Sequence, residues 1–434
     1  MARKVFISIL GISYYNEAKY YFDNDKNNFF ETRFIQEAVL RYYIEKEKIK
    51  FDNVYIFLTN RAREANWVNP AQENDKQERS PYTGLSKILD DLGVDYEGVD
   101  IPDGNSEEEL WQIFDIIYNK LQDNDLLYID ITHSFRSLPI FLTVLMNYVK
   151  TLKNVKVERI TYGNWEAREK GYAPVIDLTA VNELQNWTIA ANAFVRFGQT
   201  ELLSDLAKQE YSPILRQTKG QNETAKFLSG FDKTLNAFVK DVITNRGYNI
   251  YSGKNAKKLK EYIVKLKGQT LDPLEPLLDK INQRLDNLDA PDEAINCFRI
   301  VKWDLEAGLI QQAYSMLREG IITYVLWKVF PEEFEHLLLD EKKRELVSSA
   351  FKIIIQDYSE DDWNENAKNN KEFIQEIIDF EFDREFIKEF DRLGQLRNDI
   401  MHAGFRKGAN KSDKLIEEIK KSFEKIIQIL NIEL

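Results

Sequence analysis

The chain has 434 residues, a hydrophobic fraction of 43% and a formal net charge of -13. The length predicts two to three domains, and the apolar content suffices for packed cores, which excludes a disordered or fibrous chain. The excess of acidic residues excludes a broadly basic surface, so any RNA or DNA site must be a local basic patch.

Cysteine and histidine are scarce. The single cysteine, Cys297, excludes an internal disulfide framework and a cysteine zinc site. The three histidines, His133, His336 and His402, leave almost no room for a histidine metal cluster, so we expect no metal and no cofactor. The longest apolar stretch is shorter than the roughly 18–20 residues that span a bilayer. We therefore expect a cytoplasmic protein with no membrane contact.

The first 180 residues alternate strand-like and helix-like segments. Short apolar runs predict buried strands at 5–10 and 54–58 and a third strong strand at 126–131. A strand is also expected at 155–162, and 95–101 could form a short strand. Helical spacing predicts helices at 32–46, 82–92, 106–122 and 138–153. Strands that alternate with helices predict parallel pairing, as in a Rossmann-like α/β domain.

The rest of the chain has helical spacing and almost no strand pattern. We expect helices at 182–207, 222–245, 255–267, 272–287, 291–306, 308–329, 343–356, 370–381, 384–402 and 412–431. The predicted fold class is thus α/β plus all-α. The predicted domains are an α/β domain at 1–181, a helical linker region at 182–300 and a helical domain at 301–434.

Polar residues follow the strand predicted at 126–131, namely Thr132, His133, Ser134 and Arg136. In an open parallel sheet, ligands bind outside the carboxyl ends of the strands. Hydroxyls, an imidazole and a guanidinium at this edge, beside the N–H groups of a helix start, suit a phosphorylated or nucleotide ligand. A polar strand-to-helix turn capped by Thr132 or Ser134 explains the same residues.

Gly11 and Ser13 follow the first predicted strand. Glycine lets the backbone approach a ligand closely, and the serine hydroxyl can hydrogen-bond to it, although a simple turn explains an isolated glycine as well. Neither a GxGxxG pattern nor a P-loop is present, so a dinucleotide cofactor is not supported. Because this loop and the loop at 132–136 both follow buried strands, we expect them to meet at one edge of the sheet.

A third pattern, with the spacing R-x4-H, lies near the carboxyl end of the chain. On a helix, Asn398 and His402 share a face, and Arg397 is long enough to reach the same site. Histidine suits proton transfer near neutrality, and arginine can clamp a phosphate. Together they could cleave RNA without a metal, with the ribose 2′-OH as nucleophile. Basic side chains that complement their own helix dipole before Gly404 also explain the spacing.

Taken together, these motifs resemble the CRISPR-associated ancillary ribonucleases of type III systems, which join a CARF sensor domain to a HEPN nuclease domain. The resembling residues are Leu10-Gly11 with Tyr14 and Tyr20, 32–38, 104–111, 130–139, 308–313 with Arg318-Glu319, and Arg397-Asn398 with His402. The family often has glycine where this chain has Ser134. It also often has a Gly-Thr-Gly-like loop where this chain has Gly11-Ile12-Ser13.

The resemblance implies a metal-independent endoribonuclease of antiviral defence that cleaves single-stranded RNA when a cyclic oligoadenylate binds. Cyclic tetra-adenylate is the favoured activator. The sensor domain would dimerise and bind it through Gly11, Ser13, Thr132, His133, Ser134 and Arg136. The HEPN domains would also pair, in a homodimer or higher even oligomer, and unite two copies of Arg397, Asn398 and His402. The sensor could in addition open the ligand ring weakly.

Two other classes fit parts of the sequence. A ligand-responsive CRISPR-associated transcription regulator would need a basic DNA-reading helix. The dense basic stretch at 254–267 is a candidate, and a solvated helix face explains it as well. A metabolic α/β enzyme with a helical oligomerisation domain would need a small-molecule cofactor, against which the absent glycine fingerprint argues.

Overall fold

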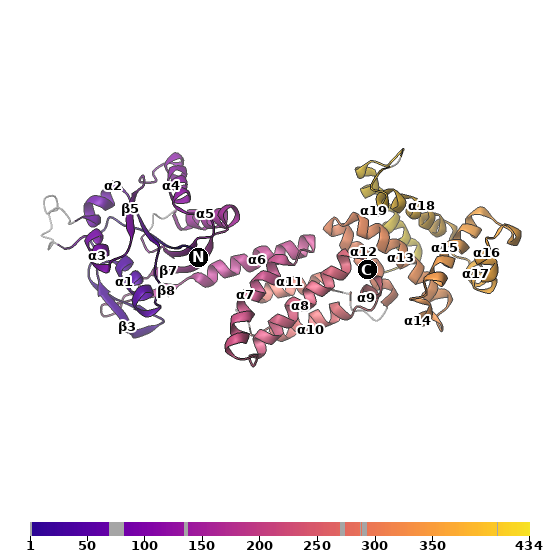
Figure 1. Cartoon of the computed structure of the whole chain (residues 1–434), viewed down its shortest axis with the longest axis horizontal. Coiled ribbons are helices and arrows are strands. Elements are labelled where there is room, and N and C mark those ends of the chain that lie inside the picture. Colours follow the sequence, from indigo (N-terminus) through magenta and orange to yellow (C-terminus); the bar gives the residue numbers. More distant parts are fainter. Residues whose placement is uncertain are drawn as a thin grey trace. The chain divides into compact units, whose positions relative to one another are not determined.

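The computed structural model describes residues 2–68, 82–133, 138–269, 274–286, 288, 293–405 and 407–434. The chain forms two compact units, at 1–183 and 184–434 (Figure 1). An α/β unit is followed by a helical one, which confirms the predicted class. The further division expected between residues 300 and 301 stays a prediction.

An eight-stranded sheet forms the centre of the first unit, in the order β3-β2-β8-β7-β6-β1-β4-β5. Five strands run parallel and correspond to the predicted ones: β1 (Lys4–Ile9), β4 (Asn53–Leu58), β5 (Tyr96–Asp100), β6 (Leu126–Asp130) and β7 (Lys156–Gly163). The carboxyl ends of these strands therefore lie at one edge, as the positions of the predicted loops require.

The other three strands extend the sheet beyond β7 and were not predicted. They are β2 (Ala18–Phe22), β3 (Asp25–Thr32) and β8 (Tyr172–Asp177), with β8 antiparallel to β7. The hairpin between β2 and β3 turns at Asp23 and Asn24, whose φ angles are 55° and 56°. Aspartate and asparagine tolerate this left-handed conformation, which the tightest hairpin turns need.

Helices cover both faces of the sheet. Figure 1 shows α1 (Ile35–Arg41) and α3 (Leu85–Leu92) on one face, and α4 (Glu107–Lys120) and α5 (Leu138–Lys153) on the other. Alternate residues of β1 supply both cores, with Phe6 packed on the α1 side and Ile7 on the α5 side. A strand buried on both faces must be almost wholly apolar, and the buried polar residue in β1 is Ser8, which belongs to the site below.

Short helical turns complete this unit. α2 (Asn60–Ala62) follows β4 and continues into a π-helical turn at Arg63–Trp67, and a second π-helical turn at Tyr42–Lys46 follows α1. The predicted helix start at Ser106 is confirmed, because its side chain accepts a 3.2 Å hydrogen bond from the Glu109 amide.

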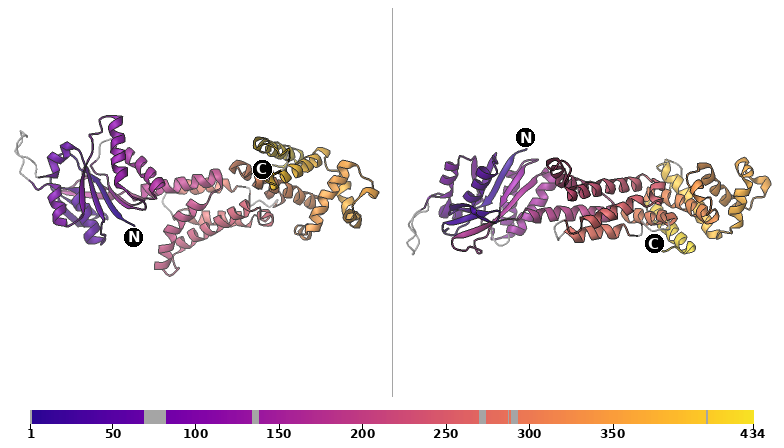
Figure 2. Two further views of the ribbon diagram at one scale, coloured as in Figure 1. Left: turned by 45° about the horizontal axis from the view of Figure 1, so that its top comes forward. Right: turned by 90° about the horizontal axis from the view of Figure 1, so that it is seen from below.

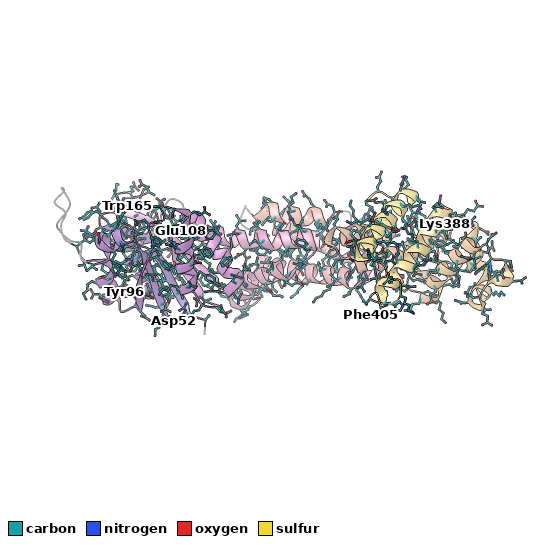
Figure 3. All side chains as sticks on the ribbon, turned by 90° about the horizontal axis from the view of Figure 1, so that it is seen from above. Asp52, Tyr96, Glu108, Trp165, Lys388 and Phe405 are labelled. Carbon is teal, nitrogen blue, oxygen red and sulfur yellow. The ribbon has the colours of Figure 1, made fainter. Side chains whose placement is uncertain are left out.

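All regular secondary structure described in the second unit is helical (Figure 2, and Figure 3 with side chains). Its helices are α6 (Thr179–Phe197), which begins in the first unit, α7 (Glu201–Gln217), α8 (Glu223–Ile243), α9 (Gly247–Tyr251), α10 (Lys254–Leu266), α11 (Glu275–Arg284), α12 (Glu293–Ala307), α13 (Ile310–Val329), α14 (Phe334–Leu337), α15 (Glu341–Gln356), α16 (Glu365–Asn369), α17 (Lys371–Asp379), α18 (Arg384–Met401) and α19 (Ser412–Leu430).

The predicted helices are found, apart from one break. The segment predicted as a single helix at 182–207 is interrupted at Gly198, whose φ of 66° favours glycine. At the centre of the unit, α12 and α13 approach closely at Gly320, where a Cβ would lie 3.0 Å from the Cβ of Cys297. Cys297 is buried there as a free thiol. Among the described residues, none of the helices combines the length and the apolar character that crossing a membrane requires.

Candidate functional site

Two predicted loops meet at the carboxyl edge of the parallel strands. A Cβ at Gly11, after β1, would lie 3.4 Å from the Cβ of His133, after β6, and would overlap the Tyr15 hydroxyl. Glycine at position 11 thus leaves room for the Tyr15 hydroxyl, and the first loop lies in ordinary contact range of the second. The expectation that both loops reach one edge of the sheet is therefore confirmed for Gly11 and His133.

A buried chain of hydrogen bonds lies beneath these loops on the α1 side of the sheet. The Gln36 amide donates to the Ser8 hydroxyl (3.2 Å), which donates to Asp130 Oδ2 (2.7 Å). Asp130 Oδ1 accepts from the hydroxyl (2.5 Å) and the backbone amide (3.1 Å) of Thr132. Thr132 Oγ1 in turn accepts from the Gly163 amide (2.7 Å). The chain links α1, β1, β6 and β7.

This network gives Thr132 a structural role in addition to its predicted contact with a ligand. Its hydroxyl donates to Asp130 and accepts from Gly163, which fixes the first turn after β6. Asp130 is 2% exposed. Burial raises the pKa of its carboxyl group, against the hydrogen bonds from Thr132 and Ser8. The backbone and side chain of Thr132 are thus held in place before any ligand binds.

Asn66 fixes the other loop and was not predicted as a site residue. It lies in the π-helical turn after β4 and is fully buried. Its side-chain amide donates to the carbonyl oxygens of Gly11 (2.8 Å) and Ser13 (3.0 Å), and its own oxygen accepts from the Tyr82 hydroxyl. Because both carbonyls bind Asn66, the loop has a defined backbone conformation. The Ser13 side chain is exposed.

His133 is a neutral base at this edge. Its ring lies 4.5 Å from the Tyr15 ring, centroid to centroid, at an interplanar angle of 31°. Burial lowers the pKa of His133 to about 4, and its Nε2 has no hydrogen-bond partner among the described residues. At neutral pH, His133 can therefore offer one hydrogen bond but no charge. Ser134 and Arg136 lie outside the described residues.

The positively charged side chain of Arg33 also lies beside the first loop. Its guanidinium donates to the Tyr15 carbonyl (2.7 Å) and lies 5.1 Å from the Tyr82 ring centroid and 5.6 Å from that of Tyr14. Glu17 lies 3.5 Å from its Nε. The positive charge near the loop is thus partly compensated. Arg33 belongs to the 32–38 motif but was not predicted as a site residue.

The three residues of the R-x4-H pattern lie at the carboxyl end of α18. His402 is the C-cap, and its backbone amide donates to the Asn398 carbonyl (3.1 Å). Both side chains are exposed and Arg397 is half-buried. The buried Asp399 binds the backbone amide (2.7 Å) and the side-chain amide (2.9 Å) of Asn410. This contact fixes the return of the chain from α18 towards α19.

A pocket of about 260 Å³ lies beside Asn398. Gly394, Phe390 and Asn398 of α18 line it, together with Arg318 of α13. The Arg318 guanidinium lies 4.9 Å from the Phe390 ring centroid and donates to Ser348 (3.0 Å). Its pKa is lowered, mainly by burial; the nearby charge of Glu319 opposes this effect and that of Arg397 adds to it.

The guanidinium groups of Arg318 and Arg397 therefore lie close enough to affect each other. Two like charges are costly at such a place unless an anion binds. In the sequence, the Arg318-Glu319 pair belongs to the family resemblance, but Arg318 was not predicted as a site residue. Its neighbour Glu319 lies 3.7 Å from it and is also bound by Arg344. Among the described residues, no group of three or more histidine, cysteine or acidic side chains is placed to hold a metal ion.

Comparison with known proteins bears on the first unit. Residues 5–166 match the family described as CRISPR system endoribonuclease Csx1, CARF domain. The chain is also similar to the CRISPR-associated protein MJ1674 of Methanocaldococcus jannaschii, at 27% identity over 313 residues, which make up 70% of this chain and 42% of that protein. The chain thus spans less than half the length of this relative.

The family match contains both Gly11 and His133, so it covers the edge of the sheet where the two loops meet. These similarities thus relate the first unit to the CARF domain of a CRISPR system endoribonuclease family. The match ends before the helical unit, where the residues of the R-x4-H pattern lie.

Proposed function

We propose that the protein is an endoribonuclease of type III CRISPR defence that cyclic oligoadenylate activates and that cleaves single-stranded RNA without a metal. The observation that carries the proposal is the CARF match over 5–166 in a chain whose helical unit holds Arg397, Asn398 and His402 at one helix end. A ligand-sensing unit and a reactive unit would thus be joined in one polypeptide.

The edge of the sheet where the Gly11 and His133 loops meet, here called the sensor edge, suits a ligand with adenine bases and phosphates. Gly11 permits close backbone approach, and the unpartnered Nε2 of neutral His133 can hydrogen-bond to a base or a ribose hydroxyl. Ser13, Thr132, Ser134 and Arg136 complete the proposed set. Cyclic tetra-adenylate is the favoured activator, and Arg136 would supply the charge for its phosphates.

An exposed apolar face supports pairing of two sensor domains. Val144, Tyr148 and Leu152 follow one another at intervals of four along α5 and are 58%, 46% and 53% exposed. Residues at this spacing share one helix face. A second copy of the domain would cover this face in the proposed homodimer or higher even oligomer, across whose two-fold axis a symmetric ring can bind.

The end of α18 supports the chemistry. His402 is exposed at the C-cap, where it can remove the proton of the 2′-OH or protonate the leaving 5′-oxygen. Arg397 and Arg318 would stabilise the negative charge of the phosphorane, and Asn398 would hold a phosphate or base by its amide. Two copies of α18 would form the composite site of the proposed dimer. Weak opening of the ligand ring in the sensor is proposed as a second, separate activity.

A cleavage assay tests the proposal. Labelled single-stranded RNA is incubated in EDTA with cyclic tri-, tetra- and hexa-adenylate in turn. We expect cleavage with cyclic tetra-adenylate, products with 2′,3′-cyclic phosphate ends, and a loss of about 10²-fold or more in His402→Ala. His336→Ala is the matched control, because His336 lies on α14, outside the proposed site. Full activity of His402→Ala, or cleavage that needs a divalent metal, would contradict the assignment.

A further inference from the structure

Helix α10 carries a concentrated positive charge. In a chain with a formal net charge of -13, residues 254–267 contain six lysines and one acidic residue, Glu261. Electrostatic attraction is screened over about 8–10 Å at physiological salt. A polyanion that touches α10 therefore responds mainly to these lysines and much less to the acidic residues elsewhere.

Most of these lysines are not neutralised by neighbouring carboxylates. Lys260 pairs with Asp286 (3.4 Å), and Lys267 pairs with Asp279. The other four are exposed and, within the described ranges, have no carboxylate within 4.0 Å of the ammonium nitrogen: Lys254, Lys257, Lys258 and Lys265. Unpaired surface lysines are available to phosphates.

An aromatic ring lies among these lysines. The Tyr262 ring centroid is 6.0 Å from Lys258 Nζ and 5.6 Å from Lys265 Nζ. The ring is half-buried and crosses α8 at Gly230, where any Cβ would overlap it. Helices α8 and α10 lie side by side in Figure 1. Gly230 therefore supplies the space that holds the ring in place between the two lysines.

We propose that Lys254, Lys257, Lys258, Tyr262 and Lys265, here called the α10 surface, bind single-stranded RNA. Lysines neutralise the phosphates, and a tyrosine ring between them offers a stacking face to an unpaired base. Duplex DNA presents phosphates but no free base faces, so the ring favours a single strand. The identification of this RNA as the substrate rests on the proposed function, whereas its binding does not.

The α10 surface would raise the affinity for RNA without taking part in cleavage. Figure 1 shows α10 and α18 as separate helices of the second unit, and the residues of the R-x4-H pattern belong to α18. We expect this contact to bind RNA equally strongly in the ground state and in the transition state, so that it lowers KM and leaves kcat unchanged. Each phosphate contact to a single strand contributes about -0.7 to the slope of log affinity against log salt.

The test measures binding of a labelled, unstructured 20-nucleotide RNA to the full chain by fluorescence anisotropy across a salt series. All proteins carry His402→Ala, so that cleavage does not disturb the measurement. We expect Lys258→Ala/Lys265→Ala to weaken binding about tenfold and to reduce the salt slope by about 1.4. Tyr262→Leu keeps an apolar side chain at this position but has no π face, and should weaken binding about fivefold or more.

Lys208→Ala/Lys342→Ala is the matched control, because it removes two exposed lysines from α7 and α15. It should change the affinity less than twofold. An α10 double variant with the affinity and salt slope of this control would overturn the proposal. Tighter binding of duplex DNA than of RNA, lost in the α10 variant, would also overturn it and assign the surface to DNA.

The same variants without His402→Ala separate this proposal from the proposed function. In an active nuclease, Lys258→Ala/Lys265→Ala should raise KM with kcat unchanged. If the wild-type chain cleaves no RNA under any cyclic oligoadenylate but binds RNA through α10, the endoribonuclease assignment fails and the surface stands. If the chain cleaves RNA but the α10 double variant binds RNA as tightly as the control, the endoribonuclease assignment stands and the proposed role of the α10 surface fails.

Discussion

The Ser8 hydroxyl donates a 2.7 Å hydrogen bond to the Asp130 carboxylate, and the two residues are register partners in the parallel pair of β1 and β6. Both residues are 2% exposed, so water cannot replace the bond if it is lost. The contact therefore couples the strand before the first site loop to the strand before the second.

Removal of this bond should destabilise the first unit. In Ser8→Ala, Asp130 Oδ2 loses its donor inside the core, which should cost about 1–3 kcal/mol. Hydrogen exchange of peptides covering β1 and β6 measures the change. Ser13→Ala is the control, since the Ser13 side chain is exposed and its loss should alter stability by less than about 0.5 kcal/mol. Equal effects of the two changes would contradict the prediction.

The stability of the folded chain should fall as the pH drops from 6.5 to 4. Burial lowers the pKa of His133 to about 4, whereas the unfolded chain protonates near 6.5. In this window only the unfolded state takes up a proton, so up to about 3 kcal/mol is lost, and nothing further is lost from this group below pH 4. The imidazole NMR resonance that disappears in His133→Gln should titrate near pH 4.

That variant also supplies the control for the stability change. In His133→Gln, the free energy of unfolding should no longer show the part of its pH dependence between pH 6.5 and 4 that His133 causes. A resonance that titrates near pH 6.5 would show that the imidazole is accessible to water and charged in the folded state, contrary to its burial.

Loss of the Asn66 side chain should weaken the response to the activator. Asn66→Ala removes two hydrogen bonds that hold the carbonyl groups of Gly11 and Ser13. The loop must then be ordered by the ligand, which should raise the concentration of cyclic tetra-adenylate for half-maximal cleavage about tenfold. Tyr82→Phe leaves both Asn66 hydrogen bonds in place, so it should change this activator concentration less. Unchanged activation of Asn66→Ala would show that the loop does not contact the ligand.

Arg318 should contribute to RNA cleavage although it lies outside the R-x4-H pattern. Arg318→Ala removes one of the two guanidinium groups near Asn398, and we expect kcat to fall about 10²-fold. Ser348→Ala removes the hydrogen-bond acceptor of Arg318 but leaves the charge, so it should retain most activity. If both variants are equally impaired, the role of Arg318 is structural.

Gly394 gives an independent test of the same pocket. A Cβ at Gly394 would lie 3.9 Å from Arg318 Nε, which is an ordinary contact distance. Gly394→Ala should therefore keep cleavage and stabilise α18 by about 0.5–1 kcal/mol, because alanine favours a helix interior. Gly394→Leu fills the pocket and should inhibit cleavage. Full activity of the leucine variant, measured in the same assay, would exclude the pocket from RNA binding.

Strands β1, β4 and β6 were predictable because they are buried on both faces and so form continuous apolar runs. The missed hairpin differs, since residues of β3 such as Asn27 and Asn28 are polar and the strand lies at the edge of the sheet. Its Asp23-Asn24 turn was a usable signal. Edge strands need fewer apolar residues, so an apolar run alone does not identify a strand such as β3.

The site was predictable in part for a related reason. Parallel strands end at one edge, so Gly11 and His133 were expected to meet, as they do. Asn66 was not found because it reaches the loop from a segment 53–55 residues away, through a π-helical turn that has no sequence signature. The functions of Ser134, Arg136, Arg397 and His402 stay predictions.

The buried network beneath the sensor edge also bears on how such a protein can evolve. Ser8, Gln36, Asp130 and Thr132 are bound to one another and hold the fold. Ile12 and Ser13, by contrast, are exposed at the edge and make no side-chain contribution to that network. Under the proposed function, substitutions at these two positions would change which cyclic oligoadenylate is recognised without a loss of stability. The scaffold thus separates the residues that mutation must preserve from those that selection is free to alter.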